Sequence, residues 1–126
     1  MENLPQTIDK EHLENIEIVQ QTARQIIKDF AAYGLEIHFS GSATQAYHEL
    51  CPQMASQLFK LMECENERLF ALMYHIDLHP DSVWQCLTSP DKPFEKLADL
   101  VIRREMLKVL TVRYFKSQHS KPAHGS

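Results

Sequence analysis

Apolar residues spaced three and four positions apart constrain this chain more than any other feature. That spacing is the period of one face of an α-helix, and it predicts helices over residues 9–33, 42–62, 66–76, 80–88 and 93–116. We therefore expect an all-α fold, either an orthogonal or an up-down five-helix bundle with the C-terminal helix at its centre. Residues 9–117 form the single predicted domain, between a flexible N-terminus (1–8) and a disordered tail (118–126).

Glycine and proline mark several of the predicted boundaries. Gly34 suits the left-handed position just past the first helix, and Pro93 suits the first position of the last. Ser42 and Gln45 have the spacing of a capping box, which predicts the start of the second helix there. Because the apolar phase survives Pro52, that proline is expected to kink the second helix without ending it.

One short segment breaks the helical pattern. Residues 35–39 alternate apolar and polar side chains and are rich in β-favouring types, so they have the character of a strand. No second strand is predicted to pair with this one. The segment is thus either an extended linker or a strand that pairs antiparallel with its own copy in a dimer.

The last helix has an unusual distribution of apolar residues, which point in nearly every direction around its axis. Such a helix is expected to be covered on most sides, either at the centre of the fold or at a subunit interface. Together with residues 35–39, this distribution predicts a homodimer. The predicted interface residues are Ile37 and Val109.

Charge is divided unevenly along the 126 residues. The formal net charge is −4, with −6 on residues 1–66 and +2 on residues 67–126, so the halves are expected to attract each other within the fold or across a dimer. The mild overall acidity argues against a protein built mainly for nucleic acid. The basic residues of the last segment could serve such a role, or could form salt bridges to the acidic first helix: Arg103, Arg104, Lys108, Arg113, Lys116 and Lys121.

The cysteines and the N-terminal composition bear on compartment. Cys51, Cys64 and Cys86 are odd in number and widely spaced, which predicts free thiols in a reducing cytoplasm. The first residues are acidic where a secretory signal would be basic, and no apolar run is long enough for a membrane span. We expect a cytoplasmic protein that does not enter a membrane.

Two groups of potential metal ligands or nucleophiles are present. His75 and His79 flank Asp77, but Pro80 should hold His79 out of helical geometry, so the two imidazoles are not expected to converge. His48 lies one helical turn from Cys51, and either Cys64 or His38 could complete a site. A cysteine within a helix is more often a small buried hydrophobe. Neither group is therefore assigned as a metal, catalytic or cofactor-binding site.

Familiar functional motifs are missing from the sequence. Its three glycines, at 34, 41 and 125, rule out glycine-rich phosphate loops and a nucleophile elbow. Residues 69–87 have the order of a helix-turn-helix, but the second helix carries no lysine or arginine to contact phosphates. No cofactor is expected.

The stretches Leu72–Asp77 and Leu97–Glu105 carry a resemblance that spans about the last half of the chain. Their pattern resembles that of small uncharacterised bacterial all-helical proteins, a group with no assigned activity, so the resemblance implies a helical fold and no catalytic residue. The sequence predicts a non-enzymatic interaction or structural module with an unidentified protein partner. The alternatives are a nucleic-acid accessory protein that uses the basic last helix and a cryptic metal-dependent enzyme.

Overall fold

The computed structural model describes the chain from Gln6 to Ser120, and it is all-α, as predicted. Five α-helices follow one another: α1 (Gln6–Ala31), α2 (Ala46–Cys64), α3 (Asn66–Ile76), α4 (Pro80–Leu87) and α5 (Pro93–Ser120), with a 3₁₀ turn η1 (Ala43–Gln45) before α2. The predicted flexible start and disordered tail lie partly outside the described residues. Where they overlap with them, residues 6–8 and 118–120 are helical.

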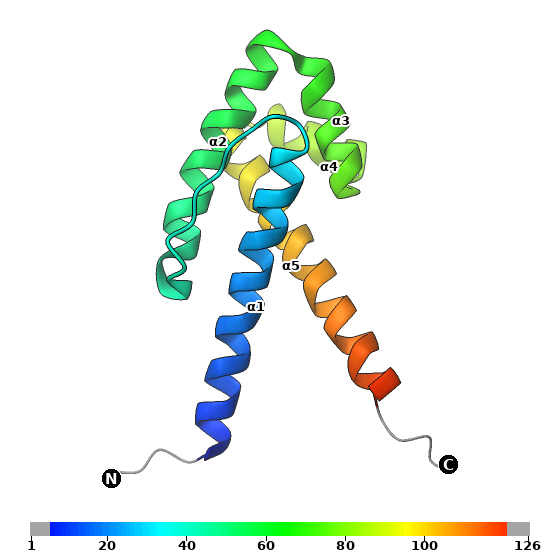
Figure 1. The fold of residues 1–126 in the computed structure, drawn as a ribbon. Helices are drawn as coiled ribbons and strands as arrows, with labels where there is room; N and C mark the ends of the chain where they lie inside the picture. Colours follow the sequence, from blue (N-terminus) through cyan, green and yellow to red (C-terminus); the bar gives the residue numbers. More distant parts are fainter. Residues whose placement is uncertain (1–5, 121–126) are drawn as a thin grey trace.

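The core forms where α5 crosses the other helices. The first half of α5 contacts α1, α2, α3 and α4 and contributes Leu97, Ala98 and Val101, which are fully buried. Across from it, α1 contributes Ile26 and Phe30, which are also fully buried. The helix predicted to be central is therefore central over its first half. Toward the chain ends α1 and α5 diverge, so that the molecule has a closed half and an open half (Figure 1).

The helix ends agree with the sequence at the prolines and at Gly34 but not at the second helix. Pro93 begins α5, Pro52 lies inside an uninterrupted α2, and Gly34, with a φ of +79°, ends the turn of residues 32–34 that follows α1. The predicted capping box is wrong. Ser42 makes no side-chain cap hydrogen bond, and its hydroxyl lies 3.1 Å from Thr44 Oγ1 while η1 forms in place of a capped first turn.

Residues 35–39 form an extended segment that lies against α2, and no strand occurs between Gln6 and Ser120. Its alternation is as predicted, because Leu35 and Ile37 are buried while Glu36 and His38 face outward. The pairing with a second copy stays a prediction, because the structure holds one chain. The side chain of Ile37 is 4% exposed and belongs to the core of that chain.

Side chains of α2 supply the hydrogen bonds that a neighbouring strand would have made. Gln53 accepts from the His38 backbone N–H at 2.9 Å and donates to its carbonyl at 2.8 Å. Gln57 donates to the Glu36 carbonyl, and Glu49 accepts from the Ser40 N–H. Four helical residues rise about 6 Å, close to the roughly 6.6 Å of two extended residues, so an i, i+4 row of side chains matches every second residue of the segment.

Candidate functional site

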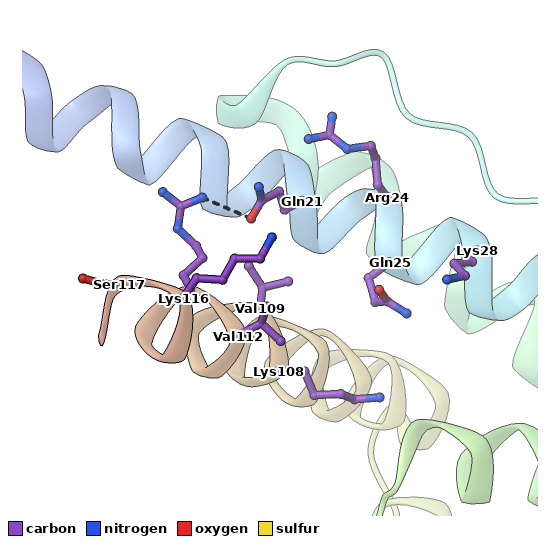
Figure 2. Close-up of a pocket in the computed structure, with 10 residues that line it drawn as sticks. Gln21, Arg24, Gln25, Lys28, Lys108, Val109, Val112, Lys116 and Ser117 are labelled. Carbon is purple, nitrogen blue, oxygen red and sulfur yellow. Dashed lines mark hydrogen bonds between the residues drawn. The ribbon is translucent and has the colours of Figure 1, made fainter. Parts of the chain in front are cut away.

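A groove of about 870 Å³ separates α1 from the second half of α5 (Figure 2). It continues the face through which the two helices meet in the core, at the point where they begin to diverge. Four of its lining residues belong to α1 and six to α5: Gln21, Arg24, Gln25, Lys28, Lys108, Val109, Val112, Arg113, Lys116 and Ser117. Two valines thus lie among five cationic side chains, and no carboxylate lines the groove.

Only part of this positive charge is compensated within the chain. Arg113 bridges the groove, donating to Gln21 Oε1 at 3.1 Å and to Glu17 Oε1 at 3.2 Å. Arg24 and Lys28 form no ion pair with the residues that the structure describes, and neither does Lys116. The groove is consequently a region of positive potential with a small apolar floor.

Arg103 and Arg104, which lie on α5 outside the groove, each pair with an acid. Arg103 Nε lies 2.8 Å from Asp99 Oδ2, and Arg104 donates to Asp77 Oδ2 at 2.7 Å. The predicted salt bridges to the acidic first helix are therefore right for Arg113 alone among the described basic residues of this segment. Arg103, Arg104 and Lys108 pair with acids in α5 itself or just past the end of α3, whereas Lys116 has no such partner among the described residues.

Residues 107–118 of α5, hereafter the α5 arm, project beyond the core and expose large apolar side chains. Their exposed fractions lie between 42% and 59%: Leu107, Leu110, Val112, Tyr114 and Phe115. The prediction that most sides of this helix are covered is wrong for the arm within one copy. Four helices are enough to cover the first half of α5, but α1 diverges and α2 to α4 do not extend along the arm (Figure 1).

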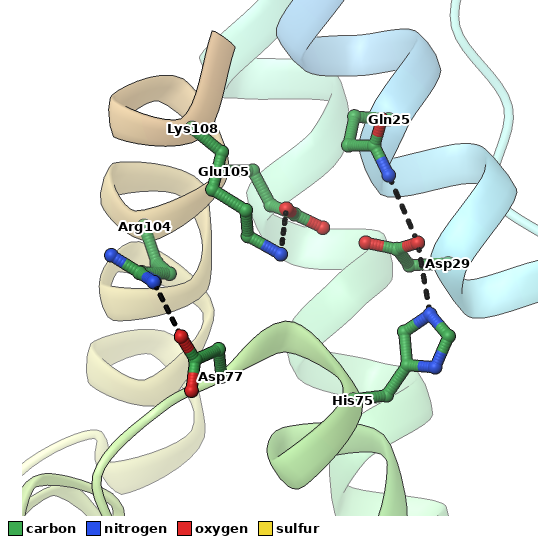
Figure 3. Close-up of polar contacts among 7 residues, drawn as sticks. All are labelled: Gln25, Asp29, His75, Asp77, Arg104, Glu105 and Lys108. Atoms are coloured by element: carbon green, nitrogen blue, oxygen red, sulfur yellow. Dashed lines mark hydrogen bonds and ion pairs between the residues drawn. The ribbon is translucent and has the colours of Figure 1, made fainter. Parts of the chain in front are cut away.

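A pair of buried carboxyl groups lies beside the inner end of the groove (Figure 3). Asp29 of α1 is 2% exposed, and Glu105 of α5 is fully buried. Gln25 donates to Asp29 Oδ1 at 3.0 Å, His75 Nε2 lies 3.3 Å from the same oxygen, and Lys108 Nζ lies 3.2 Å from Glu105 Oε1. Since Gln25 and Lys108 also line the groove, they connect the pair to it.

The two carboxyl groups have opposite pKa shifts. Burial and the neighbouring Asp29 raise the pKa of Glu105 to about 8. Burial acts in the same direction on Asp29, but hydrogen bonds from Glu105 and Gln25 and the charges of Lys108 and His75 outweigh it, so the pKa of Asp29 is lowered. Near neutral pH the pair holds one proton, on Glu105. Asp29 Oδ2 has no hydrogen-bond partner among the other described groups. The protonated Glu105 carboxyl can donate a hydrogen bond to it.

His75, Asp77 and His79, the first group of potential ligands, are bonded to different partners. His75 contacts Asp29, whereas Asp77, in left-handed geometry at φ 72°, accepts from Arg104. His79 caps α4, where its Nδ1 accepts from the Asp81 N–H at 3.1 Å. Among the described residues no group of three or more histidine, cysteine, aspartate or glutamate side chains is arranged to hold a metal ion.

The second group is also dispersed. Cys51 is buried and its pKa is raised, chiefly by burial, which disfavours the thiolate that a nucleophile or metal ligand requires. Its neighbour Tyr47 donates to Asp99 at 3.1 Å. His48 is exposed beside the Tyr47 ring, Cys64 is exposed at the end of α2, and His38 lies 3.6 Å from Glu36.

The helix-turn-helix order of residues 69–87 corresponds to α3 and α4. Phe70 and Trp84 pack with ring centroids 5.3 Å apart, which joins the two helices. The exposed polar side chains of α4 include Asp81 and Gln85, and α4 carries no cation. This pair of helices therefore lacks the groups that would contact phosphates.

Sequence reasoning missed the carboxyl pair and the α1 side of the groove. Asp29 lies within the apolar stripe of α1, between Ile26 and Phe30. A carboxylate on the buried face of a helix was the one sign in the sequence of a buried polar contact. Arg24 and Lys28 belong to a charged face that the helical pattern assigns to solvent. Their position opposite α5 depends on a crossing of two helices far apart in the chain, which the periodicity of either helix does not contain.

Comparison with protein-family models, with curated proteins and with solved structures found no match for this chain. The resemblance to small bacterial helical proteins therefore stays a prediction. None of the helices between Gln6 and Ser120 combines the length and apolar character required to cross a bilayer.

Proposed function

We propose that this chain is a non-enzymatic interaction module that forms a homodimer through the α5 arm. The observation that carries the proposal is the exposure of five large apolar side chains along the last turns of an otherwise well-packed helix. Isolated exposed apolar residues are common on monomers, but a row of them on a projecting helix is typical of an interface.

The arrangement of these side chains favours a second copy of the chain. Leu107, Leu110 and Tyr114 follow one another at three- and four-residue steps and share one face of the arm. Val112 lines the groove, so the apolar residues of the arm point both toward α1 and away from it. A two-fold related arm presents the same apolar steps, and each arm can then cover the other.

Light scattering at micromolar concentration tests the proposal. We expect a mass of twice 14.7 kDa for the wild type, falling to 14.7 kDa for Leu110→Asp. Tyr74→Asp is the matched control, because Tyr74 is 85% exposed on α3, away from the arm, and should leave the dimer intact. A wild-type mass of 14.7 kDa across the concentration range would overturn the proposal.

A cytoplasmic location also remains part of the proposal. It is supported by the three cysteines, all of which are free: Cys51, Cys64 and Cys86. Cell fractionation with an antibody to the chain would test it, and recovery from a secreted or membrane fraction would contradict it.

The alternative function with a specific observation in its favour is nucleic-acid binding through the groove cations. Against it, four of the α5 basic residues have acidic neighbours within 3.2 Å: Arg103, Arg104, Lys108 and Arg113. The groove also contains no aromatic side chain on which a base could stack. A gel shift at low salt separates this alternative from the homodimer.

A further inference from the structure

The groove between α1 and α5 is a second candidate binding surface. Its positive charge and its apolar floor indicate the kind of partner that it would bind. Arg24, Lys28 and Lys116 bring uncompensated positive charge together around Val109 and Val112. Like charges held close together repel one another, and an anionic occupant relieves that repulsion. A phosphate group alone would leave the valines exposed to water, whereas an acidic amphipathic helix satisfies both the cations and the apolar floor.

The first half of α1 is such a helix. It exposes Glu11, Glu14 and Glu17, and Leu13 among them is 60% exposed. Within one copy, Glu17 already pairs with Arg113 at 3.2 Å, so the acidic end of α1 and the basic arm of α5 are chemically matched. Glu14 has no ion-pair partner among the described residues.

The face of α1 that lines the groove is self-complementary when two copies run antiparallel. At 3.6 residues per turn, Glu14, Glu17, Gln21, Arg24 and Lys28 fall within one stripe, with the acids at one end and the cations at the other. A two-fold axis through Gln21 sets the second copy's Glu14 opposite Lys28 and its Glu17 opposite Gln25, one residue from Arg24. Symmetry then forms each pair twice.

From this juxtaposition we infer that the cationic groove receives the acidic first half of α1 from a second copy of the chain, with the two α1 helices antiparallel about Gln21. The inference rests on the proposed homodimer and names the second contact within it. In this arrangement Leu13 of the second copy lies toward the valines of the groove floor. The groove contact is electrostatic where the α5 arm contact is apolar, so the two respond differently to salt and to mutation.

A charge exchange within one chain tests the ion pairs. Lys28→Glu and Glu14→Lys should each raise the dimer dissociation constant roughly tenfold, because each change replaces two attractive pairs with two repulsive ones. The double variant, Lys28→Glu with Glu14→Lys, should restore the wild-type value. Lys60→Glu on α2 is the control, since it makes the same change in charge at an exposed position away from the groove.

A disulfide tests the register. In a Cys64→Ser background, Gln21→Cys should form a covalent dimer under mild oxidation, because the two copies of residue 21 face each other across the axis. Ser56→Cys, exposed on α2, should not. Equal cross-linking by both variants would overturn the antiparallel arrangement.

The outcomes separate this inference from the proposed function. If no dimer forms under any condition, both fail. If a dimer forms and Leu110→Asp dissociates it, while Lys28→Glu and Glu14→Lys behave like Lys60→Glu, the groove inference alone is overturned. Single variants that weaken the dimer without rescue by the double variant also overturn it. The groove inference is also overturned if Lys28 is required for a nucleic-acid gel shift at low salt but not for dimer formation.

Discussion

The closed and open halves of this molecule are built on the same two helices but differ in what surrounds them. In the closed half, α1 and α5 cross beneath α2, α3 and α4, and Phe30 and Leu97 are fully buried. In the open half the same helices continue without cover, and Phe115 is 55% exposed. Apolar content alone therefore does not distinguish core from surface along α5. Whether an apolar residue of α5 is buried depends on how many helices lie beside α5 at that point along its length.

Identical substitutions in the two halves should give the largest contrast. Phe30→Ala removes a fully buried ring and is expected to lower the free energy of unfolding by about 3–5 kcal/mol. Phe115→Ala in dilute solution should change it by less than about 0.5 kcal/mol, because the ring contacts mostly water in one copy. Urea denaturation of both variants measures the difference. Similar losses at both positions would contradict the division into a closed and an open half.

A second test concerns the buried carboxyl pair between the halves. The pKa of Glu105 in the folded chain is about 8 against an ordinary value of 4.5, so between these values the folded state holds a proton that the unfolded state has released. Stability should consequently fall as the pH rises through this window, by at most about 1.4 kcal/mol per pH unit. Glu105→Gln keeps a hydrogen-bond donor toward Asp29 but cannot ionise, and it should flatten this dependence.

Thermal unfolding from pH 5 to pH 8 would measure that effect as the difference between wild type and variant. The lowered pKa of Asp29 acts in the other direction, adding stability above its ordinary value of 3.8 that is lost only at more acid pH. It therefore does not mask the result. Parallel profiles for wild type and Glu105→Gln would contradict the assignment of the proton to Glu105.

A small effect is also expected at the ion pair that joins α1 to the α5 arm. Arg113→Gln removes the interaction with Glu17, whose side chain is 61% exposed, and should lower the free energy of unfolding by about 0.2–1 kcal/mol at low salt. The loss should shrink further at 1 M salt, where screening is strong. Chemical denaturation at two ionic strengths measures it. A loss comparable to that of Phe30→Ala would contradict this, because it would mean that the contact between α1 and the α5 arm stabilises the chain as much as a buried core side chain does.

The same division explains how far the sequence could predict the structure. Local periodicity was sufficient to predict all five helices. Pro93 was sufficient to predict the start of the last helix, and Gly34 was sufficient to predict the turn that ends the first. Residues 35–39 were predicted to be extended, but the partner of their backbone is a row of side chains on α2, and Gln53 and Gln57 carry no local sign of that role. The capping box failed because Ser42 enters a 3₁₀ turn.

The candidate site was less predictable because it joins residues from distant parts of the chain. Arg24 and Lys108 line one groove only because α1 and α5 cross at a particular angle. The carboxyl pair needed Asp29 and Glu105 to be identified as neighbours, although each lies within an apolar stripe of its own helix. The sequence predicted apolar residues all around the last helix, but not that those of the arm lack cover within one copy.

The bonds between α2 and residues 35–39 have a consequence for aggregation. A free extended segment offers its N–H and carbonyl groups as a template on which other chains can add strands. Here the His38 N–H and carbonyl are both occupied by Gln53, and the Glu36 carbonyl is occupied by Gln57. One edge of the most strand-like stretch of the sequence is thereby closed to an added strand, without a proline or a β-bulge to block it.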